Sequence, residues 1–453
     1  MKQYLKGAIC AAALVVAASG CNDFLKGGDL TNNPNAPTTA TSTQLFESAQ
    51  SNLWQEQSGD LARLTSIWFQ QMFGANRQAS GIQDFTGVVE GTYDAEFARA
   101  YQGGGIIDLR KIEANSLTGG DSVFLGIAKI IEVWLVGTDA DIWGDIPYTQ
   151  ADSFLVYPQP VLDSQQVVYD SVQSKLSQAI AELETGVGAG PGPFDLTYGG
   201  DPSKWAALAR TLKARYFLHV AERVGTAAYD SALAEATLGI SSNDGDYIAN
   251  FSGSQNAESN PWWQFFDTNG GTGRSGDITG QPSYLDSLLV ATGDPRESEY
   301  YDATNTGNGG FSAFRFGQTY PQPFVTYNEN LLIIAESQFQ TGATAAALVS
   351  LNQERTAWAT ATPWHHAITL APVGAISLAA IMNEKYITLF QNIEVWNDYK
   401  RTCYPQIVPF AGGVGGVVPG RLLYPVGERQ TNTNVPPVSA QPARNWNDPN
   451  PCT

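Results

Sequence analysis

The fold is decided by a stretch in the middle of the chain that reads Asp201-Pro202-Ser203-Lys204-Trp205-Ala206-Ala207-Leu208-Ala209-Arg210-Thr211-Leu212. Asp followed by Pro is typical of a helix N-cap and its first helical residue. The apolar residues then recur at intervals of three and four, which predicts a helix with one buried face. A second helix is predicted from about 226 to 238, closed by Gly239.

The spacing of Trp205, Leu208, Ala209 and Leu212 is similar to that of the first helix of a tetratricopeptide repeat. Alanine replaces the usual glycine, and leucine replaces the usual tyrosine. Another helix pair of similar length is predicted at 327–340 and 343–358, joined through Gly342. Two such pairs predict a mostly α protein built as a tetratricopeptide-like array of helical hairpins.

Apolar residues at helical spacing predict further helices on both sides of this stretch. Before it they lie from 45 to 72 with a possible cap at Ser58, from 93 to 112, from 123 to 134 and from 168 to 183, with a loop expected from 139 to 152. After it they lie from about 375 to 402. The segment 250–326 is rich in Gly, Asn, Ser and aromatics, and we expect it to form a large irregular, ligand-binding side.

The first twenty residues have the pattern of a signal peptide. Lys2 and Lys6 precede an apolar run from Ala8 to Ala18, which is too short to span a bilayer. The end of the run, Ala18-Ser19-Gly20-Cys21, resembles a bacterial lipobox, in which the chain is cut before the cysteine and the cysteine receives acyl chains. Several acyl chains hold a protein durably on a membrane. An ordinary secretory signal is the alternative, because leucine is commoner than alanine at position 18.

Cleavage would leave three parts. We expect residues 1–20 to be the signal peptide, residues 21–43 to be a flexible tether, and residues 44–453 to be a single helical domain. The tether is rich in Asn, Pro and Thr and cannot bury a core. No later segment of the sequence is apolar enough to span a bilayer.

The composition argues against nucleic acid as a partner. The formal charge is −19, and it becomes −21 when Lys2 and Lys6 leave with the signal peptide. Such an acidic chain repels phosphate backbones. Only 15% of the residues are charged, so uncharged polar residues supply much of the surface, which suits a neutral, hydrogen-bonding ligand.

Two cysteines remain beyond the signal peptide and the anchor. Cys403 and Cys452 are compatible with one disulfide, which would close a loop of about fifty residues, and two free buried thiols are the alternative. They are too few for a metal cluster. His219 lies in a helical pattern and is interpreted as a packed residue.

Seven short motifs occur in order along the mature chain. They are Cys21-Asn22-Asp23-Phe24-Leu25, Asn33-Pro34-Asn35-Ala36-Pro37, Gly144-Asp145-Ile146-Pro147-Tyr148, Asp294-Pro295-Arg296, Tyr327-x-Glu329-x-x-Leu332-Ile333-x-Ala335-Glu336, Glu384-Lys385-Tyr386 with Trp396-Asn397-Asp398-Tyr399-Lys400-Arg401-Thr402, and Arg421-Leu422-x-Tyr424-Pro425-x-x-Glu428 followed by Asn432. Together they resemble the SusD/RagB family of nutrient-capturing lipoproteins of the outer membrane, in its SusD-like branch. Lys400 replaces the usual arginine, and Cys403 replaces the usual glycine.

The resemblance implies a lipid-anchored protein at the cell surface that captures a nutrient, most simply an oligosaccharide, with a peptide as the alternative. It implies a SusC-like TonB-dependent outer-membrane transporter as partner and no cofactor or catalytic residue. Most motif residues are interpreted as scaffold. Glu336, Asp398 and Arg401 are candidates for polar contacts between helices.

The predicted ligand site is an aromatic cluster in the irregular segment. Four aromatics within five residues cannot all point inward from a glycine-rich loop. About half of them are expected to be buried anchors, and the others to offer a flat face to a sugar ring or an apolar side chain. The cluster is Trp262, Trp263, Phe265 and Phe266. Rim hydrogen bonds are expected from Gln264, Asn269 and Arg274.

A second surface is expected from Trp68, Asn76 and Arg77, near the region where relatives contact ligand, although Trp68 also fits the buried stripe of its helix.

Two other classes of function are weighed against nutrient binding. A surface hydrolase would need a recognisable catalytic motif, and the sequence contains no Gly-x-Ser-x-Gly elbow, no His-Glu-x-x-His and no phosphate loop. His219-x-x-Glu222 is a lone pair on a helix, and Asp139-x-Asp141-x-x-x-Asp145 lacks the full pattern of a calcium loop. The remaining alternative is a structural lipoprotein that binds nothing.

Overall fold

The computed structural model describes residues 40–266, 273–410 and 417–452. Its contacts divide the chain into residues 1–44 and residues 45–453, and the second unit holds the fold apart from the first residues of helix α3. Most of the expected signal peptide and tether, with Cys21, therefore lies outside the described residues. In the part of the chain that the structure describes, no helix is both long and apolar enough to cross a bilayer.

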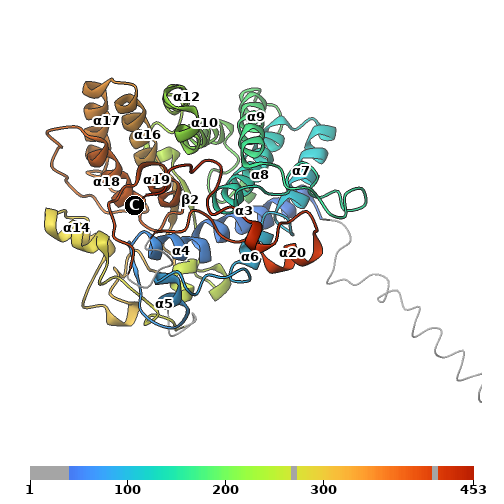
Figure 1. The fold of residues 1–453 in the computed structure, drawn as a ribbon. Helices are drawn as coiled ribbons and strands as arrows, with labels where there is room; N and C mark the ends of the chain where they lie inside the picture. Colours follow the sequence, from blue (N-terminus) through green and yellow to red (C-terminus); the bar gives the residue numbers. More distant parts are fainter. Residues whose placement is uncertain (1–39, 267–272, 411–416, 453) are drawn as a thin grey trace, which may run out of the picture. The chain divides into compact units, whose positions relative to one another are not determined.

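The unit is mostly helical, as the sequence predicts, and Figure 1 shows its elements. The helices are α3 (Ser42–Ser58), α4 (Asp60–Trp68), α5 (Arg77–Gln83), α6 (Asp94–Ala98), α7 (Ile106–Gly119), α8 (Ser122–Trp143), α9 (Gln165–Glu184), α10 (Pro202–His219), α11 (Ala221–Val224), α12 (Thr226–Ala236), α13 (Pro261–Phe266), α14 (Tyr284–Thr292), α15 (Glu297–Tyr300), α16 (Tyr327–Gln340), α17 (Thr344–Ala357), α18 (Leu378–Thr388), α19 (Val395–Thr402) and α20 (Val426–Thr431). The strands are β1 (Phe73–Gly74), β2 (Tyr247–Ala249), β3 (Ile278–Thr279) and β4 (Gln322–Val325).

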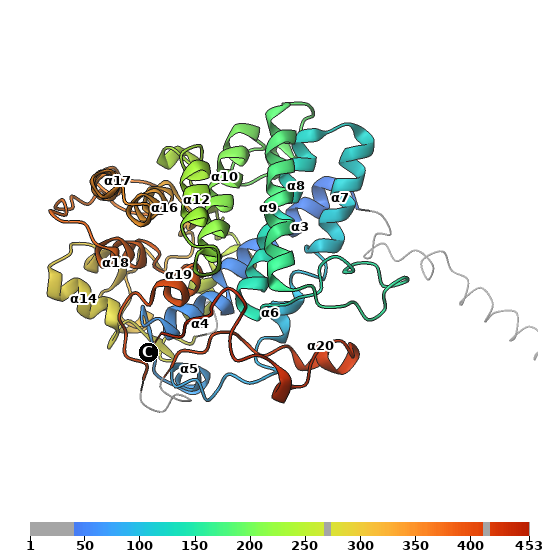
Figure 2. The same cartoon turned by 45° about the horizontal axis from the view of Figure 1, so that its top comes forward.

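The long helices form the predicted array of hairpins. Helices α7, α8, α9, α10, α12, α16 and α17 each pack against the next, and α18 packs against α16. Figures 1 and 2 show these helices side by side, with α5, α6, α14 and α20 on the opposite side of the unit. The two predicted hairpins, α10 with α12 and α16 with α17, are confirmed.

The local signals for the first hairpin are also confirmed. The Asp201 carboxylate caps α10 by accepting hydrogen bonds from the backbone N–H groups of Ser203 (2.9 Å) and Lys204 (3.3 Å). Pro202 is the first helical residue, where its missing N–H leaves no helical hydrogen bond unmade. Trp205 and the three apolar residues that follow it in the pattern are fully buried. The cap therefore fixes the start of α10, and burial of its apolar face stabilises the rest of the helix.

Two predicted boundaries are wrong. Helix α8 continues through Asp139 and Asp141 to Trp143, because nearly every one of its side chains is buried and the helix is the central element of the core. The two carboxylates therefore lie inside a helix and not in a loop. Ser58 ends α3 and donates its hydroxyl to Trp54 O instead of capping α4. The helices predicted from about 375 to 402 are present as α18 and α19.

Buried ion pairs join the helices, as predicted for Glu336, Asp398 and Arg401. The Arg401 guanidinium donates to both Glu336 oxygens and to Asp398 Oδ1, and its side chain is only 2% exposed. Lys385 adds a bond of 2.9 Å to the same Asp398 oxygen. These contacts tie α16, α18 and α19 together. The motif residues are therefore scaffold.

The segment 250–326 is less irregular than predicted. It contains α13, α14, α15, β3 and β4. Strand β4 pairs with β2 in antiparallel register, with Tyr247 opposite Val325 and Ala249 opposite Gln322. Strand β3 pairs with β1, which lies about two hundred residues earlier, with Phe73 opposite Thr279 and Gly74 opposite Ile278. The segment is thus pinned to other parts of the unit in its interior, through β3, and at its C-terminal end, through β4.

The chain after α19 is anchored by a disulfide and by contacts with the helices. Cys403 and Cys452 are bonded, with 5.2 Å between their Cα atoms. Cys403 is the C-cap of α19 and has φ +57°, a left-handed conformation that glycine adopts most easily. Leu422 N–H donates to Ile142 O, and Asn447 donates its amide to His219 O. The segment therefore returns across the helices.

Candidate ligand-binding site

The predicted aromatic cluster is a short helix and not an open loop, which changes the role of most of its members. Trp262 and Phe266 are fully buried, and Phe265 is 9% exposed. Phe266 packs edge-to-face on Phe311 and Phe316, and Trp262 packs edge-to-face on Phe316. The prediction of Trp262 and Phe266 as ligand contacts is therefore wrong, because helix α13 turns these rings into the core.

Few tryptophans of this chain lie at its surface. Of the eleven tryptophans of the chain, eight are almost completely buried. Trp68 is one of them: its indole N–H donates to Ile82 O at 2.9 Å, and its ring stacks on Trp396 with centroids 5.3 Å apart. The prediction of Trp68 as a ligand contact is also wrong, since the side chain is buried and bonds the backbone of α5. Trp263 is the half-buried aromatic of α13.

Three predicted residues line one cavity of about 820 Å³. Phe265, Arg274 and Arg77 come from two segments far apart in the sequence, and the cavity brings them together. Its other lining residues belong to α4, to α5, to the segment from 87 to 93 and to strand β3. They are Asp60, Arg63, Ile67, Gln78, Ala79, Gly81, Ile82, Gly87, Val89, Gly91, Thr92, Tyr93 and Ile278.

Backbone contacts between the two segments hold the cavity open. Besides the pairing of β1 with β3, the N–H groups of Ala75 (2.7 Å) and Asn76 (3.2 Å) both donate to Asp277 O. The Asn76 side-chain amide donates to Gly276 O at 2.6 Å. Asn76 therefore joins the two segments and does not line the cavity. It places the next residue, Arg77, at the rim.

One wall depends on a close approach of two glycines. Gly87 N–H donates to Gly81 O at 2.7 Å, and a Cβ atom added to Gly87 would lie 2.8 Å from the Gly81 carbonyl carbon. Any larger residue would push the segment from 87 to 93 away from α5. The wall carries two carboxylates, but both have partners: Asp84 accepts from Thr86, and Glu90 forms an ion pair with Arg429 of α20. Neither of them lines the cavity.

Arginines dominate the charge of the cavity. Arg63 pairs with Asp60, and Arg274 pairs with Asp277 at 2.7 Å. Arg77 lies 3.4 Å from the same Asp277, and its side chain is 68% exposed. Three guanidiniums thus face two carboxylates, which leaves one positive charge in excess.

The Phe265 ring lies among these cations. The guanidinium carbon of Arg63 is 4.7 Å from the ring centroid, and that of Arg274 is 5.0 Å from it. Both are at the distance of a cation–π contact. Tyr93, the other aromatic residue of the lining, is 6% exposed. Of the described residues that line the cavity, no aromatic presents a broad open face to a sugar ring.

The pKa values of two neighbouring carboxyl groups, Asp60 and Glu96, are shifted in opposite directions. Burial alone would raise the pKa of Asp60, but the Arg63 guanidinium outweighs it and lowers that pKa below its usual range. Burial, reinforced by the charge of Asp60, raises the pKa of Glu96. Asp60 is therefore the charged member of the pair and remains the partner of Arg63.

Of the two further predicted residues, Gln264 does not line the cavity. Gln264 donates its amide to Ser259 O at 2.6 Å and so braces the start of α13. Asn269 lies outside the described residues.

The sequence reasoning missed Asp60, Arg63 and Gln78. The i, i+3 pairs Asp60-x-x-Arg63 and Arg274-x-x-Asp277 were available as local signals, but nothing in the sequence indicates that the two pairs meet.

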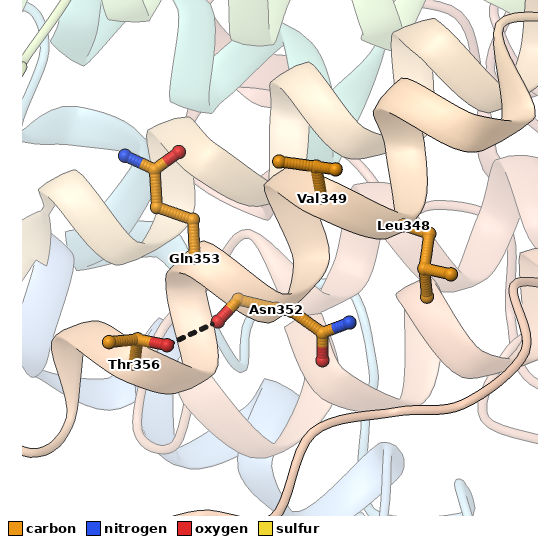
Figure 3. Close-up of a pocket in the computed structure, with 5 residues that line it drawn as sticks. All are labelled: Leu348, Val349, Asn352, Gln353 and Thr356. Atoms are coloured by element: carbon orange, nitrogen blue, oxygen red, sulfur yellow. Dashed lines mark hydrogen bonds between the residues drawn. The ribbon is translucent and has the colours of Figure 1, made fainter.

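Other hollows of the unit differ in character. One of about 440 Å³ lies between α6, α7 and the segment from 147 to 160, and its charged lining residues are Asp152 and Glu428. Another is formed by five residues of α17 alone (Figure 3). There the amide of Asn352 bonds the backbone of Val373, and Gln353 bonds Tyr327. Its polar side chains thus brace neighbouring elements, and the cavity beside α5 is the better candidate site.

His219 and the two carboxylates that contact it are enclosed. His219 lies between Asp141 and Glu394, with nitrogen–oxygen distances of 2.9 Å to each. Burial alone would lower the pKa of His219, but the two carboxylates outweigh it and raise that pKa to about 9. Among the described residues, no group of three or more His, Cys, Asp or Glu is arranged to hold a metal ion.

The fold is a helical array, and the cavity beside α5 is its candidate ligand site. The family described as "Starch-binding associating with outer membrane", SusD-like, matches residues 34–425. The chain therefore belongs to the SusD-like family. No protein of curated function matches it.

Solved structures share the fold at low sequence identity. A SusD/RagB family protein from Bacteroides thetaiotaomicron VPI-5482 is 20% identical with a TM-score of 0.72, and the match covers 91% of this chain and 98% of that one. A chitin-binding protein is 21% identical with a TM-score of 0.74, covering 90% and 100%. A chitin-binding SusD homologue from Flavobacterium johnsoniae is 19% identical with a TM-score of 0.70, covering 90% and 99%.

Proposed function

We propose that this protein captures an oligosaccharide at the surface of the outer membrane and passes it to a SusC-like TonB-dependent transporter. The observation that carries the proposal is the cavity beside α5, which joins two segments distant in sequence and lies within the part of the chain that matches the family. Its volume of about 820 Å³ is in the range of small-molecule sites. The family description and the chitin-binding neighbours favour a glycan.

Binding of oligosaccharides to the full-length protein tests the proposal directly. Titration calorimetry with starch and chitin oligosaccharides and with acidic glycans would show which of them bind. Arg274→Ala should weaken binding about tenfold or more, because it removes a guanidinium from the lining. Trp262→Ala is unsuitable as a test, since the ring is buried and its loss would disturb the core.

Trp263 tests how far the ligand extends beyond the cavity. It is half-buried on α13 and does not line the cavity. Trp263→Ala weakens the binding of long oligosaccharides if their outer sugars stack there. Trp446→Ala is the matched control, because Trp446 is also half-buried and its ring contacts Arg223 of α11. Folded Arg274→Ala and Trp263→Ala variants that bind as tightly as the wild type would refute this placement of the site.

The anchor is proposed at Cys21, which lies outside the described residues. Processing there would leave an acylated cysteine at the N-terminus and hold the protein on the membrane. Mass spectrometry of the detergent-extracted protein should find a diacylated or triacylated Cys21, and Cys21→Ala should leave the chain uncut or release it. A mature, lipid-free N-terminus at another residue would contradict the anchor.

The partner is tested by co-purification from membranes. A TonB-dependent transporter should be recovered with the tagged protein. Recovery of no transporter, together with no glycan binding, would favour a structural lipoprotein. Turnover of glycans or peptides by the purified protein would favour a hydrolase. Binding of peptides in place of glycans would change the nutrient but not the class of function.

A further inference from the structure

The charges in the cavity are arranged to leave one cation available. Asp277 is 3% exposed and already bonded by Arg274 at 2.7 Å, so its contact with Arg77 at 3.4 Å is the weaker one. Asp60 is held by Arg63. Arg77 is thus the guanidinium of the cavity with the most solvent exposure and the longest ion-pair distance, and one that a ligand can engage without breaking a tight pair.

The position of Arg77 is imposed by its neighbours. Its backbone has φ +51°, a conformation that a residue other than glycine seldom adopts. The hydrogen bonds of Ala75 and Asn76 to the turn at Gly276 and Asp277 hold it there. Such a conformation persists only where the surroundings enforce it, and it is common at binding sites. The side chain is therefore presented at the rim on a fixed backbone.

The described lining of the cavity offers little exposed aromatic surface on which an uncharged sugar could stack. Phe265 and Tyr93 are both at least nine-tenths buried, and two guanidiniums lie against Phe265. Stacking of a sugar on an open aromatic face is therefore not the main source of affinity among the described lining residues. The remaining donors are charged or polar, and a guanidinium matches a carboxylate or sulfate in a bidentate geometry.

The chain as a whole makes this arrangement unusual. Acidic residues outnumber basic ones by 44 to 25, yet three arginines converge on one cavity. The hollow beside α6 has the opposite character, since its charged lining residues are both acidic. The positive excess is thus a property of this cavity and not of the surface in general.

We propose that the ligand of this cavity is an acidic oligosaccharide, whose carboxylate or sulfate group is bound by Arg77. The inference rests on the proposed function and names the substrate class of the same site. Arg274 and Arg63 supply the positive field and stay paired with their carboxylates. The two sources of the acidic group, a uronic acid and a sulfate ester, share this chemistry.

The test compares ligands that differ in charge alone. The full-length protein is titrated with oligogalacturonate and with the same oligosaccharide after methyl esterification, which removes the charge. A sulfated carrageenan oligosaccharide, which carries no carboxylate, distinguishes sulfate from uronate. Maltohexaose and chitohexaose are the neutral ligands, and oligoglutamate is the acidic peptide. We expect at least one of the two acidic oligosaccharides to bind about tenfold or more tightly than the neutral ones.

Matched variants assign the preference to Arg77. Arg77→Gln should remove most of the preference for the acidic ligand, and Arg77→Lys should retain part of it. Arg210→Gln, which removes a partly exposed, ion-paired arginine of α10, should leave binding unchanged. Thermal unfolding of each variant confirms that it is folded, as expected for a side chain that is 68% exposed.

The alternative outcomes are distinct. Equal binding of the ester and the acid, together with no tighter binding of the carrageenan oligosaccharide than of the neutral ligands, would overturn the acidic ligand and leave the proposed function standing. An unchanged preference in Arg77→Gln would do the same. Binding of oligoglutamate with no binding of any acidic glycan would overturn the glycan as well. Absence of binding to every oligosaccharide would contradict the proposed function itself.

Discussion

The helical array forms one side of this protein, the helical side, and the cavity beside α5 lies on the other, the cavity side. Both sides pair arginine with carboxylates, but the pairs differ in how much of them is exposed to solvent. On the helical side, Arg401 and Glu336 are 2% and 0% exposed, and Arg215 with Glu329 is similarly enclosed. On the cavity side, each pair has one exposed member: Arg77 is 68% exposed beside Asp277 at 3%, and Asp60 is 55% exposed beside Arg63 at 11%. Burial decides which of these pairs stabilises the fold and which is available to a ligand.

The physical reason is desolvation. A charge that has been taken out of water cannot be left without its partner, so each enclosed pair fixes the position of two helices. A charge at the rim keeps its water and gains little from its intramolecular partner. Loss of an enclosed arginine should therefore reduce stability, whereas loss of a rim arginine should change ligand binding.

The largest effect is expected from Arg401→Met. It leaves Glu336 and Asp398 without their guanidinium in a dry interior, and the free energy of unfolding should fall by about 5 kcal/mol. Urea denaturation followed by circular dichroism measures it. Arg210→Met breaks an exposed pair and should cost less than about 1 kcal/mol. Similar losses in both variants would remove the distinction between enclosed and exposed ion pairs.

Removal of the disulfide is expected to have the next largest effect on stability. It closes a loop with a sequence separation of 49 and anchors the C-terminal segment to the end of α19. Cys403→Ser/Cys452→Ser should lower the free energy of unfolding by about 4 kcal/mol on the loop-entropy account. In Cys403→Gly/Cys452→Ser the loss should be smaller, since glycine suits the backbone of position 403 at φ +57°. Two titratable thiols in the denatured, unreduced mature wild type would contradict the bond.

A smaller effect depends on pH and involves the helical side alone. The pKa of His219 is about 9 in the folded protein against 6.5 for an ordinary histidine. A raised pKa means that the charged imidazolium contributes stability below pH 6.5, and that this contribution is lost as the pH rises through 9. The size of the pKa rise corresponds to about 3 kcal/mol.

His219→Gln, which carries no charge, tests this contribution. The stability difference between the wild type and the variant should shrink by roughly that amount between pH 6 and pH 10. Guanidine denaturation at both pH values measures it. A difference that does not depend on pH would show that His219 is uncharged in the fold. Binding by the folded variant should be unaffected at neutral pH, because His219 lies outside the cavity.

The smallest effect on stability is expected at the cavity side, from Asn76→Ala. The variant loses one hydrogen bond to Gly276 O, which is worth about 1 kcal/mol. Arg77 should be held less firmly, so ligand affinity should fall by a larger factor than stability alone explains. Calorimetric titration and thermal unfolding of the same sample compare the two quantities. Unchanged affinity would show that Asn76 does not position its neighbour.

The helical side was largely predictable because its signals are local. The bounds of the helix from 327 to 340, the Asp201 cap and the buried stripe from Trp205 to Leu212 follow from hydrogen bonds and periodicity within a few residues. The same approach failed at Asp139 and Asp141, where acidic residues were interpreted as a loop. There the burial of the whole helix α8 outweighs the polar character of two side chains.

The cavity side was predicted only in part. Phe265, Arg274 and Arg77 were identified as candidates and line the cavity, but Trp262, Phe266 and Trp68 are buried. The error has one cause: an aromatic cluster in a glycine-rich stretch was taken to be a loop. Six of its residues form a helical turn that directs two of the rings inward. Sequence alone does not give the direction of a side chain in such a segment.

The sequence by itself determined the helical class of the protein, its hairpins, its candidate ion pairs and its resemblance to the SusD-like family. These properties depend on the spacing of residues along the chain. Only the tertiary structure decided which aromatics are exposed and which arginines share a cavity. The residues of the site lie about two hundred positions apart, and the pairing of β1 with β3 that joins them depends on contacts that no local pattern records.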